Sequence, residues 1–241
     1  MKRDYLSASA LKAFANSPNH DIQYVTAKRE QTPALLLGSA AHCLILEPDT
    51  FEQRYAVAPV ADRRTKAGKE VYAAFLSSSE GKDVLTQDQY EQARAIATAA
   101  FNDETVLRLV TSEGAQMERE VKAEVYGFPF LAYIDLETAG GVYDVKTTKD
   151  ASPEAFQKEA YNYGYHIQGA IYRALTGKPF YWIAIEKEAP HNVQVYKQSD
   201  AAYHRTVALI YRTVDKFKAW NGEPEGYNVK PGYELDLPQW A

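Results

Sequence analysis

The chain has 241 residues, of which 46% are hydrophobic and 24% charged, a composition typical of a globular protein with an apolar core. Its formal net charge of −5 at pH 7 argues mildly against nucleic-acid binding through a general basic surface, and leaves local basic patches to make any DNA contact. The single cysteine, Cys43, excludes an internal disulfide and a cysteine-rich zinc or iron–sulfur site.

The sequence contains no run of about 18 apolar residues, the length that would indicate a membrane-spanning helix. Its opening residues, Met1 to Ser7, lack the apolar core of a secretory signal. We therefore expect no membrane partner and a cytoplasmic location.

Three helices are expected in the first half of the chain. The first, capped by Ser7 or Ser9, ends at about Ala15, before a Ser-Pro-Asn break. The second starts after a Thr-Pro pair and covers 34–46; it is apolar nearly all round, so we expect it to be buried. The third, over 86–109, has apolar residues at helical spacing and is expected to be long and amphipathic.

The densest basic segment lies between the second and third of these helices. Its four basic residues fall within seven positions, at Arg63, Arg64, Lys66 and Lys69. A solvated loop and a flexible DNA-binding segment that contacts phosphates explain this pattern equally well.

Three strands follow the helical part, at 118–126, 130–136 and 142–147, joined by turns that contain glycine. Beyond them, the pattern predicts helices from Ser152-Pro153 and at 165–175, strands at 181–186 and 192–197, and a helix at 200–220. This order indicates an α/β or α+β fold with a sheet flanked by helices. We expect one domain over 1–241, with a mainly helical part (1–115), a catalytic core (116–220) and an irregular tail (221–241).

Asp135, Asp144 and Lys146 are the most informative residues. Asp135 lies near the end of one expected strand, and Asp144 and Lys146 lie two positions apart on the next, so these two share a face. Two carboxylates and an ammonium on neighbouring strands can hold a divalent cation and orient a water molecule, as phosphodiester hydrolysis requires. A solvated ion pair would give the same Asp-x-Lys pattern. The apolar, strand-forming residues around them favour the catalytic interpretation.

A third carboxylate is expected from the preceding strand. Glu118 and Glu120 alternate onto one face of it, which could be the face that carries Asp135. Other charged residues on this strand also fit a solvated face. Of the two glutamates we favour Glu120.

Three more residues have two interpretations each. His42 lies in an apolar helix, where a histidine is more often a core residue with a hydrogen-bond partner than a metal ligand. Gln168 and Tyr172 are four residues apart and share a helix face, from which both could donate to phosphate oxygens. A core tyrosine beside an exposed glutamine explains the same spacing.

The sequence has no P-loop, dinucleotide-binding glycine motif, Gly-x-Ser-x-Gly elbow or His-Glu-x-x-His motif. ATP-driven motor activity and serine hydrolase chemistry are therefore not expected.

Several segments together resemble one family, and they occur in the family's order over nearly the whole chain. They are Leu6-Ser-Ala-Ser9 with Ser17-Pro18-Asn-His20, residues 32–48 including Gly38 and His42, Arg64 to Lys69, Asp135, Asp144-Val-Lys146, Asn162 to Tyr172, and Leu237-Pro-Gln-Trp240. The chain resembles a PD-(D/E)XK nuclease, specifically the exonuclease VIII (RecE-like) branch of phage recombination exonucleases, and more distantly lambda exonuclease. Where this family usually has Pro-Asp, the chain has Ile134-Asp135.

The resemblance implies a restriction-endonuclease-like core, with a central mixed sheet flanked by helices. It implies an exodeoxyribonuclease that degrades linear double-stranded DNA 5′→3′ with Mg²⁺, for which Mn²⁺ can substitute. The metal ligands would be Asp135, Asp144, the Val145 carbonyl, His42 and Glu120. Lys146 would act on the attacking water, and Gln168 and Tyr172 would support the active site and the phosphate.

The resemblance also implies partners. These are double-stranded DNA ends, further copies of the chain in a ring, and a single-strand annealing protein. The resemblance also implies that the protein acts in the cytoplasm of a bacterial host and that a phage or prophage encodes it. An endonuclease or repair nuclease on the same fold is one alternative. A catalytically silent DNA-binding module is the other, and the presence of Asp135, Asp144 and Lys146 argues against it.

Overall fold

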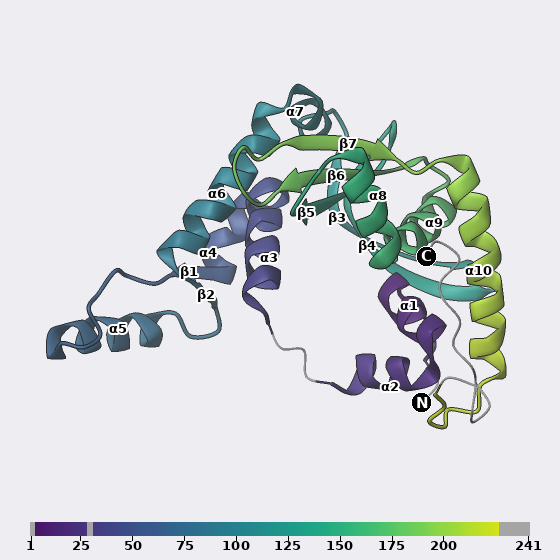
Figure 1. The fold of residues 1–241 in the computed structure, drawn as a ribbon, viewed down its shortest axis with the longest axis horizontal. Coiled ribbons are helices and arrows are strands. Elements are labelled where there is room, and N and C mark those ends of the chain that lie inside the picture. The colour runs from purple at the N-terminus through teal and green to yellow at the C-terminus, as the bar shows by residue number, and fades with distance from the viewer. Residues whose placement is uncertain (1–2, 28–30, 227–241) are drawn as a thin grey trace, which may run out of the picture.

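The computed structural model of the chain describes residues 3–27 and 31–226. Its centre is a five-stranded mixed sheet in the order β3-β4-β5-β6-β7, in which β5 and β6 are parallel and the other neighbours antiparallel. The expected mixed sheet flanked by helices is confirmed (Figure 1). The five strands are β3 (Gln116–Val125), β4 (Phe128–Thr138), β5 (Gly141–Thr148), β6 (Phe180–Glu186) and β7 (Val193–Lys197).

Helices cover both faces of the sheet (Figure 1). Before β3 come α1 (Ala8–Asn16), α2 (Pro18–Thr26), α3 (Pro33–Leu46), the 3₁₀ turn η1 (Pro48–Thr50), α4 (Phe51–Arg54), α5 (Lys66–Ser78), α6 (Gln87–Asn102) and α7 (Glu104–Val110). After β5 come α8 (Pro153–Asn162), α9 (Tyr165–Thr176) and α10 (Asp200–Ala219). A separate parallel pair is formed by β1 (Tyr55–Val57) and β2 (Asp83–Leu85). No helix among the described residues is long and apolar enough to span a membrane.

Two apolar cores lie on opposite faces of the sheet. The first joins α1, α8, α9 and α10 to side chains such as Phe130 and Phe180. The second joins α3, α4 and α6 to the sheet residues whose side chains point to the opposite face, among them Ile183 and Ile185. All four of these sheet residues are fully buried, and each contributes about 1.5–3 kcal/mol to folding by leaving water.

One local expectation is confirmed and two differ from the structure. The expected break after about Ala15 is present, because α1 ends at Asn16 and Ser17 caps the next helix, α2, through its hydroxyl. The predicted continuous helix over 86–109 is wrong: it divides at Asp103, whose carboxylate accepts two backbone N–H bonds at the start of α7. Residues 66–78 form α5 instead of a loop, with Thr65 accepting a hydrogen bond from Gly68. Most of the expected irregular tail, 227–241, lies outside the described residues.

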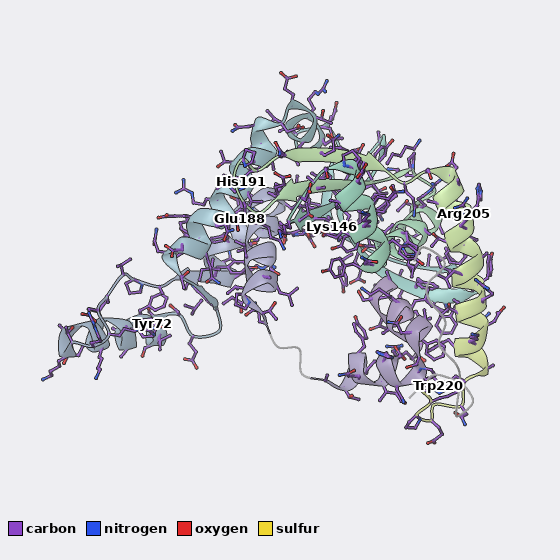
Figure 2. All side chains as sticks on the ribbon, viewed as in Figure 1. Tyr72, Lys146, Glu188, His191, Arg205 and Trp220 are labelled. Carbon is purple, nitrogen blue, oxygen red and sulfur yellow. The ribbon has the colours of Figure 1, made fainter. Side chains whose placement is uncertain are left out.

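The segment around α5 projects from the body as an arm (Figure 1). Only Gly68 of this helix is buried, while the apolar side chains of Val71 and Leu76 are about half exposed. Tyr72 marks the same arm in Figure 2. The arm therefore packs little against the rest of the chain.

Strand β4 leaves its neighbour β5 at Asp135. Their ladder includes Leu136↔Tyr143 and goes no further toward Asp135, although continuing the register would place Asp135 opposite Asp144. Ile134 packs in the first core while Leu136, two residues on, packs in the second, so the strand rotates between them. The two strands consequently open at the position of the acidic residues.

The N-terminal segment and α9 take up the edge of β4 that β5 leaves free. Leu6 donates its N–H to the Pro129 carbonyl (3.0 Å) and accepts from Leu131 N–H (2.9 Å). The Tyr172 hydroxyl donates to the Tyr133 carbonyl (2.8 Å). These bonds bring α1 and α9 to the opening between the strands.

Candidate active site

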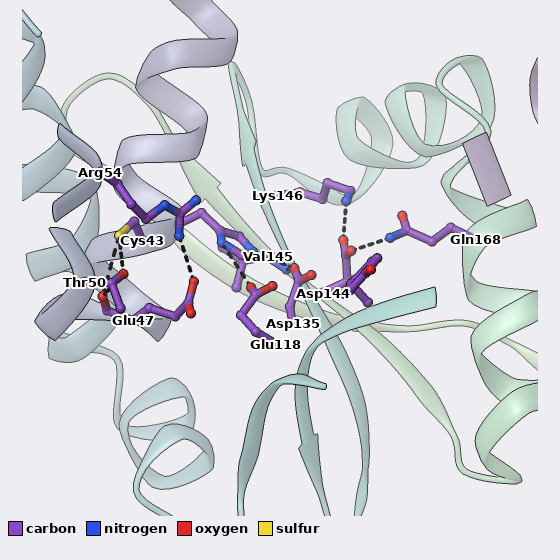
Figure 3. Close-up of polar contacts among 12 residues, drawn as sticks. Cys43, Glu47, Thr50, Arg54, Glu118, Asp135, Asp144, Val145, Lys146 and Gln168 are labelled. Carbon is purple, nitrogen blue, oxygen red and sulfur yellow. Dashed lines mark hydrogen bonds and ion pairs between the residues drawn. The ribbon is translucent and has the colours of Figure 1, made fainter. Parts of the chain in front are cut away.

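The carboxylate of Asp135 occupies the opening between β4 and β5. Its Oδ2 atom accepts a 2.8 Å hydrogen bond from the backbone N–H of Val145, in place of a strand-to-strand bond (Figure 3). Asp135 is thereby fixed against β5, beside Asp144 and Lys146.

His42 reaches this carboxylate from α3. Its Nε2 lies 3.0 Å from Asp135 Oδ2, and its Nδ1 lies 3.5 Å from Oε1 of Glu118. Gly38, one turn earlier, allows the approach of α3 to β5, because a Cβ there would lie 3.3 Å from the Thr147 hydroxyl. Ligand atoms of His42, Glu118 and Asp135 all lie within 4.8 Å of one another.

Asp144 is held on the other side of the opening. Its Oδ1 accepts a 2.5 Å hydrogen bond from the Gln168 amide, and its Oδ2 forms an ion pair with Lys146 (Figure 3). The Lys146 ammonium also lies 4.8 Å from the centre of the Tyr165 ring. Gly169 lets α9 approach β6 closely, since a Cβ there would lie 2.7 Å from the Phe180 ring. The expected common face of Asp144 and Lys146 is present.

Burial and mutual repulsion separate the protonation behaviour of the carboxylates. Burial, together with the charge of Asp135, raises the pKa of Asp144 to about 6. Burial would raise the pKa of Asp135 too, but the His42 hydrogen bond and Lys146 hold it below its usual value. Burial lowers the pKa of His42, but Asp135 and Glu118 more than offset this, so it is raised overall. Burial raises the pKa of Glu118. The site concentrates negative charge that a cation would neutralise.

The donor set fits a divalent metal ion. Oε1 of Glu118 is buried and accepts no hydrogen bond within the described part of the chain, with His42 Nδ1 3.5 Å away, whereas the buried Oδ2 of Asp144 is paired with the Lys146 ammonium. Buried acceptors without hydrogen bonds are costly, and a bound cation would satisfy them. Carboxylate oxygens suit Mg²⁺ and Mn²⁺, and the imidazole of His42 adds a nitrogen ligand.

The structure places Glu118, and not Glu120, in this cluster. Glu120 lies two residues further along β3, where it is exposed and pairs with Tyr133 of β4. Its hydrogen bond raises the pKa of the Tyr133 hydroxyl. At Glu118 the backbone has a positive φ of 51°. Neighbouring residues on β3 pair with β4, whereas Glu118 itself does not, and its side chain turns to His42.

The remaining predicted residues are divided between the site and the arm. Gln168 contacts Asp144. The Tyr172 hydroxyl instead donates to the Tyr133 carbonyl of β4, and the Tyr172 side chain is buried. The four basic residues lie on or just before α5. There Arg63 covers Tyr72, Arg64 pairs with Asp62 and Lys66 lies 4.0 Å from Glu70.

A pocket of about 480 Å³ opens beside Lys146 and Gln168. Ser7, Ser9 and Lys12 line it from α1 and its cap, and Tyr163 to Tyr165 line it from the α8–α9 turn. The Lys12 ammonium donates to the Tyr163 carbonyl at 2.9 Å, and burial, with the charge of Lys146, lowers the pKa of Lys12. Neither Lys12 nor Tyr165 was predicted from its residue type to belong to the site. Tyr165 lies within the segment Asn162 to Tyr172, which carries the family resemblance, whereas Lys12 lies between two such segments.

The family of PDDEXK-like domains of unknown function (DUF3799) matches residues 7–226. No curated protein matches the chain. Among solved structures, a candidate exonuclease from Eubacterium rectale is similar over 98% of this chain and 90% of its own, with 17% identity and a TM-score of 0.67. An alkaline exonuclease from Laribacter hongkongensis has 17% identity over 71% of this chain and 93% of its own, with a TM-score of 0.34. A phage-related exonuclease from Haemophilus somnus 129PT has 12% identity over 88% of this chain and 92% of its own, with a TM-score of 0.37.

Proposed function

This chain belongs to the PDDEXK-like domain family, and we propose that it is a metal-dependent exodeoxyribonuclease that degrades linear double-stranded DNA from its ends. The proposed direction is 5′→3′ and the proposed metal is Mg²⁺, which Mn²⁺ can replace. The observation that carries the proposal is the cluster of His42, Glu118 and Asp135 beside the Asp144–Lys146 pair. The shared fold of the Eubacterium rectale protein supports an exonuclease.

In the proposed mechanism, His42, Glu118, Asp135 and Asp144 would hold the metal, together with the Val145 carbonyl. A bound divalent cation would polarise the scissile phosphate and lower the pKa of a coordinated water. Val145 N–H keeps Asp135 in place, and the Gln168 amide does the same for Asp144.

Lys146 is proposed to act on the water and the phosphate. Its ammonium contacts Asp144 and faces the pocket beside the cluster. There it can orient the attacking water and stabilise charge that develops on the phosphate oxygens. Tyr165 keeps the ammonium in place through its ring face.

The pocket next to Lys146 supports action at DNA ends. Its wall includes the first turn of α1, the hydroxyls of Ser7 and Ser9, and the ammonium of Lys12. Helix N-termini, hydroxyls and ammonium groups bind phosphate. A terminal phosphate in this pocket would place the adjoining phosphodiester near the carboxylates.

Contacts farther along the duplex are proposed for the arm. Lys69 on α5 is exposed and makes no ion pair within the described residues, so it is free to contact a phosphate. We also propose that copies of the chain assemble into a ring around DNA and act with a single-strand annealing protein. Light scattering at working concentration tests the ring, and a monomer would contradict it.

The first experiment incubates the protein with linear and with closed circular duplex DNA, in Mg²⁺ and in EDTA. Metal-dependent loss of the linear DNA alone is the expected result, and end-labelled substrates then give the direction. Cleavage of the circle would show an endonuclease. An intact linear substrate in Mg²⁺ would contradict the proposal.

A further inference from the structure

A second, larger pocket lies across the α8–α9 turn from the pocket beside Lys146 and Gln168, the catalytic pocket. Its volume is about 880 Å³, in the range of ligand-binding sites. Its walls come from α8, the first residues of α9 and α10, and strands β6 and β7. None of its residues belongs to the carboxylate cluster.

All the charged residues that line this pocket, as far as the structure describes the chain, are basic. They are Lys158 on α8, Lys197 on β7 and Arg205 on α10. Figure 2 labels Arg205. All three are exposed, and none forms an ion pair with another described residue. Asp200, beside the lining residue Ser199, forms an ion pair with Arg173, and its charge also acts on Lys197. In a protein with a net charge of −5, this local bias indicates an anionic ligand.

Aromatic side chains connect the two pockets. Tyr161 and His166 line the larger pocket and stack on each other, with ring centres 5.4 Å apart and planes at 14°. Tyr163 and Tyr165 line the catalytic pocket, 5.7 Å apart. The side chain of Tyr161 is 75% exposed and that of Tyr163 is 57% exposed. Both rings thereby give up the packing against the core that a buried aromatic ring has. The turn thus forms a ridge of rings between Lys146 and the basic pocket.

We propose that this ridge and the basic pocket bind single-stranded DNA, the strand left unpaired as the duplex end is digested. The inference rests on the proposed exonuclease function. Proteins bind single strands without sequence preference by combining a basic groove with aromatic rings on which bases stack. The exposed ring of Tyr161 offers the stacking surface, and Lys158, Lys197 and Arg205 contact the phosphates. The unpaired strand then separates from the digested strand beside the catalytic pocket and runs over the ridge, away from the metal cluster.

The test measures binding of a fluorescent oligothymidylate of about 12 nucleotides by anisotropy in EDTA, where no cleavage occurs. Tyr161→Ala should weaken binding roughly tenfold, while Tyr161→Phe, which keeps the ring, should bind like the wild type. Arg205→Glu should weaken binding and reduce the salt dependence by about one phosphate contact. Tyr211→Ala and Arg212→Glu, at exposed positions of α10 outside the pocket, are matched controls and should have no effect.

Equal binding by Tyr161→Ala, Arg205→Glu and the wild type would overturn the inference. So would equal displacement of the DNA by an acidic polyglutamate peptide, because the pocket would then recognise charge alone. Cleavage of linear duplex by the same preparations in Mg²⁺ is measured separately. Normal cleavage with unaltered strand binding would reject the single-strand site and leave the proposed function standing.

Discussion

The backbone N–H of Val145 donates a 2.8 Å hydrogen bond to the carboxylate of Asp135. This bond takes the place of a ladder bond where β4 and β5 separate, so Asp135 holds the sheet together as well as facing the cluster. Removing its oxygens would leave a partly buried N–H without a partner, at a cost of about 1–3 kcal/mol. The activity lost in an Asp135 variant would therefore combine the effect of a destabilised fold with the effect of a missing carboxylate in the cluster. Variants of Asp144 and Lys146 test the chemistry more directly.

Asp144→Asn and Lys146→Ala should each reduce cleavage of linear duplex DNA by roughly a thousandfold or more, because each removes a charge that acts on the metal or the phosphate. The fold should persist. Asparagine keeps the shape of Asp144 and removes a buried charge whose pKa is raised to about 6. Single-turnover cleavage and thermal melting measure the two effects. Activity retained in both variants would contradict the site assignment.

Glu118→Gln should weaken binding of Mn²⁺ by about 10- to 100-fold, because it removes a charged ligand beside His42 and Asp135. Glu120→Gln is the matched control on the same strand, where the exposed side chain contacts Tyr133, and should bind the metal like the wild type. Calorimetric titration of both variants compares them directly. The reverse order of affinities would show that Glu120 is the ligand.

The different placement of these two glutamates shows how far the sequence could predict the site. Two-residue periodicity predicted the common face of Asp144 and Lys146, because β5 keeps regular geometry there. It could not distinguish Glu118 from Glu120, because the choice depends on the positive φ at Glu118 and on the turn of β4 at Asp135. Neither feature has a signal in residue type.

The helical part was predictable where its residues bury an apolar face. The buried 34–46 segment is α3, as expected. The α5 arm was missed, because it has little burial to create a pattern, although Thr65 is a recognisable helix cap. The contact between His42 and Asp135 joins residues far apart in the chain, and only the resemblance suggested it.

Gly169→Ala should reduce both stability and cleavage. The added Cβ would lie 2.7 Å from the Phe180 ring, so α9 must move away from β6, with a cost of about 1–3 kcal/mol. The movement would carry the Gln168 amide away from Asp144. Urea unfolding and single-turnover cleavage measure the two losses. Adding Phe180→Leu should restore part of the cleavage by making room, and no recovery would contradict this explanation.

Glu137 should make stability depend on pH in the acid range. Its side chain is 12% exposed and accepts from Arg119 Nε at 2.7 Å and Lys178 Nζ at 2.8 Å. Burial would raise its pKa, but Lys178 and Arg119 more than offset this, so the folded-state pKa is lowered. The folded state then binds the proton less readily than the unfolded state. The stabilisation is therefore complete above the unfolded pKa of about 4.3, and it is lost as pH falls through the folded value.

Glu137→Gln should cost about 1 kcal/mol at neutral pH, a modest value because Arg119 and Lys178 are each about a third exposed. The difference from the wild type should be smaller at about pH 3 than at neutral pH, because pH 3 lies below the unfolded pKa of about 4.3, where the stabilisation is being lost. Urea unfolding at both pH values measures it. Glu70→Gln is the control, since Glu70 is 68% exposed and lies 4.0 Å from Lys66, and it should match the wild type throughout. A constant difference between Glu137→Gln and the wild type at the two pH values would show that packing, and not the charge of Glu137, is responsible.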